Sequence, residues 1–141
     1  MDVLIKINAT IRSDSEEVTE SLVRGSYYRK DDDLYLFYEG VDEETPGLIT
    51  RHRIVVSGNC VDIQRTGALQ SKMRIVPGEL NQCEYETPYG TLEMDFFGIT
   101  VESEVDDSGM KLRLVYEIRL ADVPVSENEL LIEATVAEEE K

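Results

Sequence analysis

The chain is poor in the residue types on which most small functional motifs depend. It has no tryptophan, one histidine and two cysteines among 141 residues. One histidine excludes zinc sites that use several histidines, and two cysteines are too few for a disulfide framework. The sequence also lacks a dinucleotide-binding glycine motif, a phosphate-binding loop and a nucleophile elbow. We therefore expect no metal, no cofactor and no catalytic residues, and hence no enzymatic activity.

Positive charge is also scarce. Lysine and arginine number 14 against 30 aspartates and glutamates, which gives a net charge of −16 and a pI near 4.3. Such a surface repels phosphate groups, so the composition predicts no nucleic-acid partner and no binding to anionic membranes.

Long hydrophobic runs are missing as well. No segment approaches the ~18 apolar residues of a membrane-spanning helix, and the opening MDVLIKIN has neither the basic start nor the apolar stretch of a secretory signal. We expect a soluble cytoplasmic protein in which the thiols of Cys60 and Cys83 are reduced.

Turn residues are present at regular spacing. From Gly47 onward, glycines at 58, 67, 78 and 90 follow at intervals of 11, 9, 11 and 12 residues. Intervals of about 8–12 residues are typical of all-β sandwiches and barrels. We interpret residues 1–141 as a single β-barrel domain in which 137–141 form a frayed acidic tail.

Between the turns, apolar and polar residues alternate. The clearest run has Met110, Leu112, Leu114, Tyr116, Ile118 and Leu120 on one face. A period of two indicates a half-buried strand. The pattern predicts ten strands, at 2–12, 17–30, 34–39, 48–57, 60–66, 69–76, 79–87, 90–105, 110–120 and 128–137.

Short connections favour an antiparallel up-and-down order, because parallel strands need longer crossovers. Closure removes exposed edges, so we expect a closed or nearly closed barrel of about 8–10 strands, with a two-sheet sandwich as the alternative. A phase change around Gly98, from Phe96 to Ile99 and Val101, predicts a bulge with all three side chains inward. Gly25, also inside a long strand, marks a second bulge or a bend.

Three residues are candidates for ligand binding. His52 lies on the apolar face of its strand and would face a cavity, or else be a core histidine bonded to its neighbours. Arg65 alternates with Val61 and Ile63, so an inward guanidinium could hold a carboxylate or phosphate. It could instead reach solvent or pair with an acid. Tyr116 would line a pocket or fill the core.

The acidic clusters 31–33, 42–44 and 106–107 fall in predicted turns and lack the order of an EF-hand. Aspartate favours turns because it bonds to nearby backbone groups, so we interpret these clusters as solvated turns.

Three functions fit this pattern. The first is a non-enzymatic barrel that binds a small apolar or amphiphilic ligand through Arg65, His52 and Tyr116. The second is a scaffold with a filled barrel, whose partner would be a basic protein or a second copy of the chain in a homodimer. The third is an enzyme, which requires Arg65, His52 and a tyrosine to converge at the barrel mouth.

Three segments also carry a family resemblance. They are Gly25-Ser26-Tyr27-Tyr28, Arg65-Thr66-Gly67 and Thr87-Pro88-Tyr89-Gly90-Thr91-Leu92-Glu93-Met94. In this order and spacing they resemble the YwiB-like family, a bacterial domain of unknown function, over nearly the whole chain. The resemblance implies a calycin, or lipocalin-like, β-barrel and implies no activity. Typical lipocalins carry Gly-x-Trp near the first strand, which this chain lacks, so their role as secreted carriers is not implied.

Overall fold

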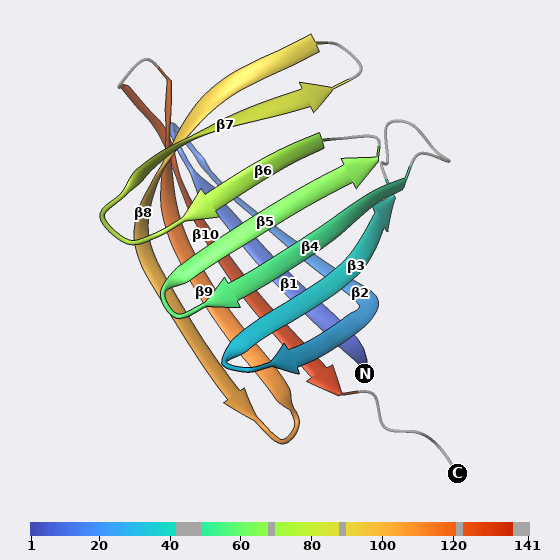
Figure 1. The fold of residues 1–141 in the computed structure, drawn as a ribbon. Helices are drawn as coiled ribbons and strands as arrows, with labels where there is room; N and C mark the ends of the chain where they lie inside the picture. Colours follow the sequence, from blue (N-terminus) through green and yellow to red (C-terminus); the bar gives the residue numbers. More distant parts are fainter. Residues whose placement is uncertain (42–48, 68–69, 88–89, 121–122, 137–141) are drawn as a thin grey trace.

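The computed structural model describes residues 1–41, 49–67, 70–87, 90–120 and 123–136, nearly all in strands. Ten strands follow one another along the chain (Figure 1). They are β1 (Asp2–Arg12), β2 (Glu16–Lys30), β3 (Asp33–Val41), β4 (Ile49–Ser57), β5 (Cys60–Gly67), β6 (Gln70–Ile75), β7 (Leu80–Thr87), β8 (Gly90–Asp106), β9 (Gly109–Leu120) and β10 (Val123–Val136). The predicted tail at 137–141 and the acidic cluster 42–44 lie outside the described residues.

The strands form one antiparallel ring. Each strand pairs with the next along the chain, and β1 pairs with both β2 and β10, which closes the barrel. The predicted up-and-down barrel is therefore confirmed, and the sandwich alternative is wrong. In the part of the chain that the structure describes, no helix is long and apolar enough to cross a membrane.

The two ends of the barrel differ in what they carry. The odd-numbered strands end and the even-numbered strands begin at one end of the barrel, which we call the mouth. The chain begins in β1 and β10 ends at the opposite end, which we call the base (Figure 1).

The ring is weakest between β6 and β7, where only two residue pairs are described. The connection between these strands is tied instead to β8. The Gly78 amide donates to the Gly98 carbonyl at 2.8 Å, and the Gly98 amide donates to the Glu79 carbonyl at 3.1 Å. Residue 98 must be glycine for this contact, because a Cβ there would collide with the Val76 carbonyl.

The predicted bulge after Gly98 is confirmed. The β8–β9 register shifts between Gly98 and Thr100, so Phe96 and Val101 both face inward. Ile99 is the extra residue and is 42% exposed, which corrects the expectation that it faces the core. Gly25 introduces no register shift; a Cβ there would lie 2.6 Å from Ile5 Cδ1, so close packing accounts for this glycine.

Alternation fills the base half of the barrel with apolar side chains. The largest fully buried ones come from all around the ring: Phe96, Ile5, Leu36, Ile54, Met73, Ile75, Leu112, Leu114, Ile132, Val3 and Val61. Burial of each such side chain contributes roughly 1.5–3 kcal/mol to folding. The inward residues of the mouth half, such as Met94 and Ile118, are only half-buried.

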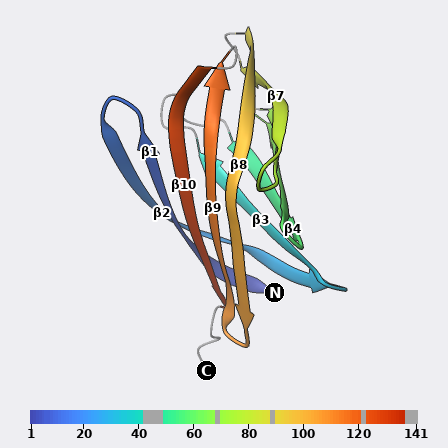
Figure 2. The ribbon, with the colours of Figure 1, turned by 90° about the vertical axis from the view of Figure 1, so that its left-hand side faces the viewer.

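Two strand ends differ from the predicted pattern. The β1–β2 hairpin projects beyond the ring, as Figure 2 shows, so Ile11 at its tip is 42% exposed although it continues the face of Val3 and Ile5. β10 begins at Val123, five residues before the predicted start. A register shift between Pro124 and Ser126 accommodates the proline, which sequence patterns treat as a strand breaker.

Candidate functional site

A row of polar side chains faces the interior near the mouth. Tyr38 on β3 pairs with His52 on β4, His52 pairs with Arg65 on β5, and Arg65 pairs with Ser71 on β6. Directly paired residues point to the same side of a sheet. The four side chains therefore stand next to one another on adjacent strands, and we call them the polar row.

His52 is held by an aromatic stack. Its ring lies parallel to that of Tyr38, with centroids 4.4 Å apart and an interplanar angle of 5°. Burial, and after it the positive charge of Arg65, lowers the pKa of His52 from 6.5 to about 4. The imidazole is thus neutral at pH 7 and can donate from one ring nitrogen and accept at the other.

Arg65 provides the positive charge of the row. It is half-buried, and its charge affects three inward groups. Burial raises the pKa of Tyr38, and Arg65 opposes that rise. Burial also raises the pKa of Cys83, against a backbone hydrogen bond at Lys72 and the charge of Arg65. The guanidinium therefore acts inside the barrel, as the alternation of β5 predicts.

Two buried atoms of the row lack partners among the described residues. His52 Nδ1 and Ser71 Oγ have no solvent exposure and no hydrogen bond there. Leaving a buried polar group unpaired costs roughly 1–3 kcal/mol. A polar atom from water or a ligand that reached these two atoms would satisfy both of them.

The structure brings Arg65 and His52 together and places Tyr116 elsewhere. Tyr116 is on β9, five strands away from β4 around the ring, and its ring packs edge-on against Phe96 at 5.6 Å. The residue paired with Tyr116 on β10 is the buried Asn128. Tyr116 thus faces the interior from the opposite wall, and its role in ligand binding stays a prediction.

Tyr38 and Ser71 were not among the residues singled out from the sequence. A signal for Tyr38 was present, because it continues the inward phase of Leu34 and Leu36. Ser71 begins the inward series that leads to Met73 and Ile75. A serine within an alternating apolar strand is only a weak signal of a binding site. Ser71 becomes a candidate once the structure shows that Arg65 is its partner on the next strand.

Other candidate chemistry has structural explanations. Asp106 Oδ1 accepts hydrogen bonds from the Ser108 amide at 2.8 Å, the Ser108 hydroxyl at 2.6 Å and the Gly109 amide at 3.1 Å. This confirms the turn role predicted for 106–107. Among the described residues, no three histidine, cysteine or acidic side chains gather as metal ligands. Cys60 and Cys83 are both free thiols.

The sequence matches one known protein family and one curated bacterial protein. Residues 5–132 match a domain of unknown function, DUF1934. The chain belongs to this family. One relative in sequence is the uncharacterized beta-barrel protein YwiB of Bacillus subtilis, 26% identical over 121 residues, 85% of this chain and 83% of YwiB. The predicted YwiB-like resemblance is confirmed.

A solved structure shows the same fold for the DUF1934 chain. The crystal structure of the ywiB protein from Bacillus subtilis matches with a TM-score of 0.86 at 21% identity, over 97% of this chain and 92% of that one. The relative is itself uncharacterized. The family therefore establishes a β-barrel protein of unknown function.

Proposed function

We propose that the barrel is a non-enzymatic binder of a small amphiphilic anion, whose head group is held by the polar row at the mouth. The observation that carries this proposal is a pair of buried atoms that find no hydrogen-bond partner among the described residues, His52 Nδ1 and Ser71 Oγ, on the two strands that flank Arg65. A carboxylate would accept from the guanidinium, from the hydroxyl and from a protonated Nδ1.

The filled base limits the ligand's size. Leu36, Ile54 and Met73, which lie next to the row on its own strands toward the base, are at most 2% exposed. Close-packed interiors admit few voids larger than a water molecule. The apolar part of the ligand must therefore be short and lie against half-buried residues such as Met94 and Ile118.

Titration of His52 tests the proposal. His52 is the only histidine, so its ring protons are unambiguous in an NMR spectrum. Short fatty carboxylates, from butanoate to octanoate, should raise its pKa, because a bound anion stabilises the imidazolium. The alcohols of equal length should not. A series in which no carboxylate shifts the His52 signals would refute the proposal.

Two variants locate the binding. Arg65→Gln should abolish the carboxylate-induced shift. The matched control is Arg51→Gln, because Arg51 belongs to the residue pair next to His52–Arg65 but lies on the outer face of β4. This variant should leave the carboxylate-induced shift unchanged. Equal responses from the two variants would place any binding outside the row.

A second candidate function rests on the filled base and on one outer wall. We infer that the outward faces of β8, β9 and β10 dock a basic protein. They carry nine carboxylates against the three cations Lys111, Arg113 and Arg119; the carboxylates, which we call the acidic wall, are Glu93, Asp95, Glu102, Glu104, Asp106, Glu117, Glu127, Glu129 and Glu133.

A lysine-rich peptide tests this docking. Binding should weaken steeply with salt, because exposed charges are screened over ~8 Å at physiological ionic strength. Glu102→Gln with Glu104→Gln should weaken it further. A sizing column tests the homodimer: a monomer at all concentrations excludes a second copy as the partner.

The setting of these functions is also a proposal. A cytoplasmic location is supported by the free thiols of Cys60 and Cys83, because a reducing compartment keeps thiols unpaired. A calycin relationship, which the family resemblance implies, is supported by the closed up-and-down ring.

A further inference from the structure

Positive charge gathers on the wall opposite the acidic one. Outward strand positions between Arg24 on β2 and Arg74 on β6 carry six cations and three carboxylates. The cations, which we call the basic wall, are Arg24, Lys30, Arg51, Arg53, Lys72 and Arg74; the carboxylates are Asp33, Glu39 and Asp62. In a ring of ten strands, β4 lies five positions from β9, so the two walls face opposite directions.

Two of the carboxylates are already neutralised. Glu39 pairs with Arg51 at 3.3 Å, and Asp62 pairs with Arg74 at 3.1 Å. Arg53 stands between these pairs, on the middle strand of the wall, with its guanidinium 5.9 Å from the centre of the Tyr35 ring. The wall therefore keeps a net positive charge on a strongly acidic protein.

The basic wall contains a groove across β2 to β5. Its volume is about 550 Å³, and Arg24, Phe37, Arg51, Arg53, Gln64 and Thr66 are among the residues that line it. A second hollow of about 490 Å³ shares Arg53 and Gln64 with the first and continues toward Lys72 and Arg74. Volumes of ~300–1,000 Å³ are typical of small-molecule sites.

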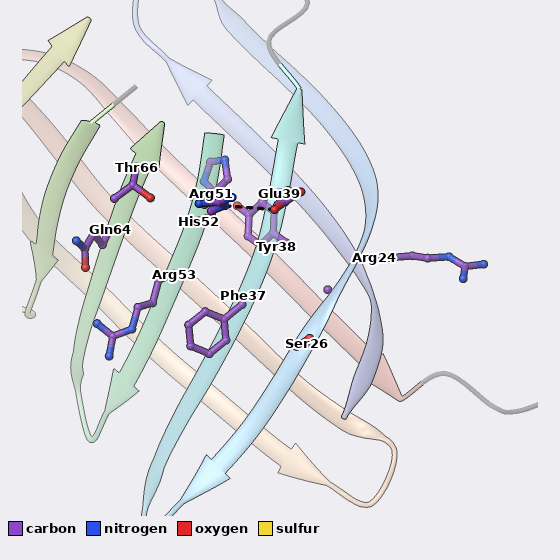
Figure 3. A pocket seen from close by; sticks show the side chains of 11 residues that line it. Arg24, Ser26, Phe37, Tyr38, Glu39, Arg51, His52, Arg53, Gln64 and Thr66 are labelled. Atoms are coloured by element: carbon purple, nitrogen blue, oxygen red, sulfur yellow. Dashed lines mark hydrogen bonds and ion pairs between the residues drawn. The ribbon is translucent and has the colours of Figure 1, made fainter. Parts of the chain in front are cut away.

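An aromatic ring forms part of the groove floor. Figure 3 shows Phe37 nearly face-on, with Arg53 beside it on β4 and Ser26 beside it on β2. The Tyr28 ring supports Phe37 edge-on, at 6.0 Å between centroids. An open aromatic face next to a guanidinium can stack a flat ring and bind an attached anionic group at once.

We propose that this outer groove binds a small anion that carries a flat ring, of the nucleoside phosphate class. The ring stacks on Phe37, the phosphate lies against Arg53, and Gln64 and Thr66 supply neutral hydrogen-bonding groups. The site is on the outer surface, and Tyr38 and His52 of the polar row also contribute to its lining.

The surrounding charge favours a small ligand over a polymer. A long nucleic acid would extend past the basic wall toward carboxylates, on a chain whose net charge is −16. A single nucleotide stays within a groove whose own carboxylate, Glu39, is paired with Arg51. Charges farther away than ~8 Å are screened in physiological salt. The electrostatic potential at the bound nucleotide is therefore set mainly by the arginines of the groove.

Calorimetry with adenosine 5′-monophosphate, adenosine and inorganic phosphate tests the proposal. The nucleotide should bind more tightly than either of its parts. Arg53→Gln should weaken its binding by about tenfold, as expected for one lost charge-assisted hydrogen bond. Phe37→Leu should weaken binding of the nucleotide and leave that of phosphate unchanged.

A matched pair on the opposite wall provides the control. Arg119 lies 4.6 Å from the centre of the Phe97 ring, so Arg119→Gln removes a similar cation from a similar aromatic. It should not change nucleotide binding. Thermal unfolding of each variant verifies that it is folded.

Three results would overturn the proposal. The first is the absence of nucleotide binding to the unaltered protein. The second is binding that Arg53→Gln and Phe37→Leu leave intact. The third is tighter binding of a single-stranded oligonucleotide than of the mononucleotide per site, which would make the wall a polymer-binding surface. The carboxylate titration of His52 uses ligands without a flat ring, so its outcome is read separately from these results.

Discussion

The rings of Tyr38 and His52 stack in parallel, 4.4 Å apart, on neighbouring strands at the mouth of the barrel. The stack covers one face of the imidazole and removes water from it. Arg65 stands on the other side, as the direct partner of His52 on β5. The only histidine of the chain thus lies between an aromatic ring and a positive charge, and its burial and, after that, the charge of Arg65 oppose its protonation.

The first prediction concerns the protonation of His52. We expect its pKa to be about 4 in the folded protein, as measured by NMR titration of its ring protons. Arg65→Gln should raise this pKa, because the charge that disfavours the imidazolium is removed. Arg51→Gln, on the outer face, should have little effect. A wild-type value near 6.5 would show that the ring is solvated.

The second prediction concerns stability against acid. The unfolded chain binds a proton at His52 near pH 6.5, whereas the folded chain does so only near pH 4. The contribution of His52 to stability is therefore present above pH 6.5 and is lost as the pH falls through this window. The free energy of unfolding of the wild type should decrease relative to that of His52→Asn between these values. Parallel curves for the two proteins would contradict this.

The third prediction compares adjacent phenylalanines on β8. Phe96 faces the core and is 1% exposed, whereas Phe97 is half-buried on the outer face beneath Arg119. Phe96→Ala should cost about 3–5 kcal/mol of unfolding free energy, because it removes transfer energy and leaves a cavity. Phe97→Ala should cost clearly less. Denaturant titration measures both, and equal losses would argue against the inward phase of β8.

The fourth prediction concerns the contact between β8 and the β6–β7 connection. Gly98→Ala should destabilise the barrel by about 1–3 kcal/mol, because the new methyl group would press on the Val76 carbonyl. Ser103→Ala, an exposed position on the same strand, is the control and should be nearly neutral. If both variants unfold at the same denaturant concentration, the contact does not hold the connection to β8.

Most of the fold could be predicted because each strand has its own pattern. The alternation from Met110 to Ile118 specifies both the strand β9 and its inward face, whereas Leu120 at the strand end is exposed. The bulge at Gly98 follows from a phase change within one segment. Ile99 was placed wrongly because period alone cannot show which residue of a bulge is the extra one. The start of β10 was missed because Pro124 weakens the strand signal.

The candidate site could be predicted only in part. The inward direction of Arg65 follows from Val61 and Ile63, and its nearness to His52 follows from the short β4–β5 turn. The separation of Tyr116 from them depends on how ten strands close into a ring, which no local pattern encodes. The basic wall has the same origin: its cations come from separate strands and become neighbours only through the register of the sheet.

The segregation of charge between opposite walls gives the barrel an electric dipole across its axis. A molecule within a few ångströms of β3 to β6 responds to that wall and only weakly to the net charge of −16, because the carboxylates of β8 to β10 lie on the far side of the protein. The protein should therefore adsorb to positively charged surfaces through β8 to β10 and to negatively charged ones through β3 to β6. These two orientations expose opposite walls to solvent.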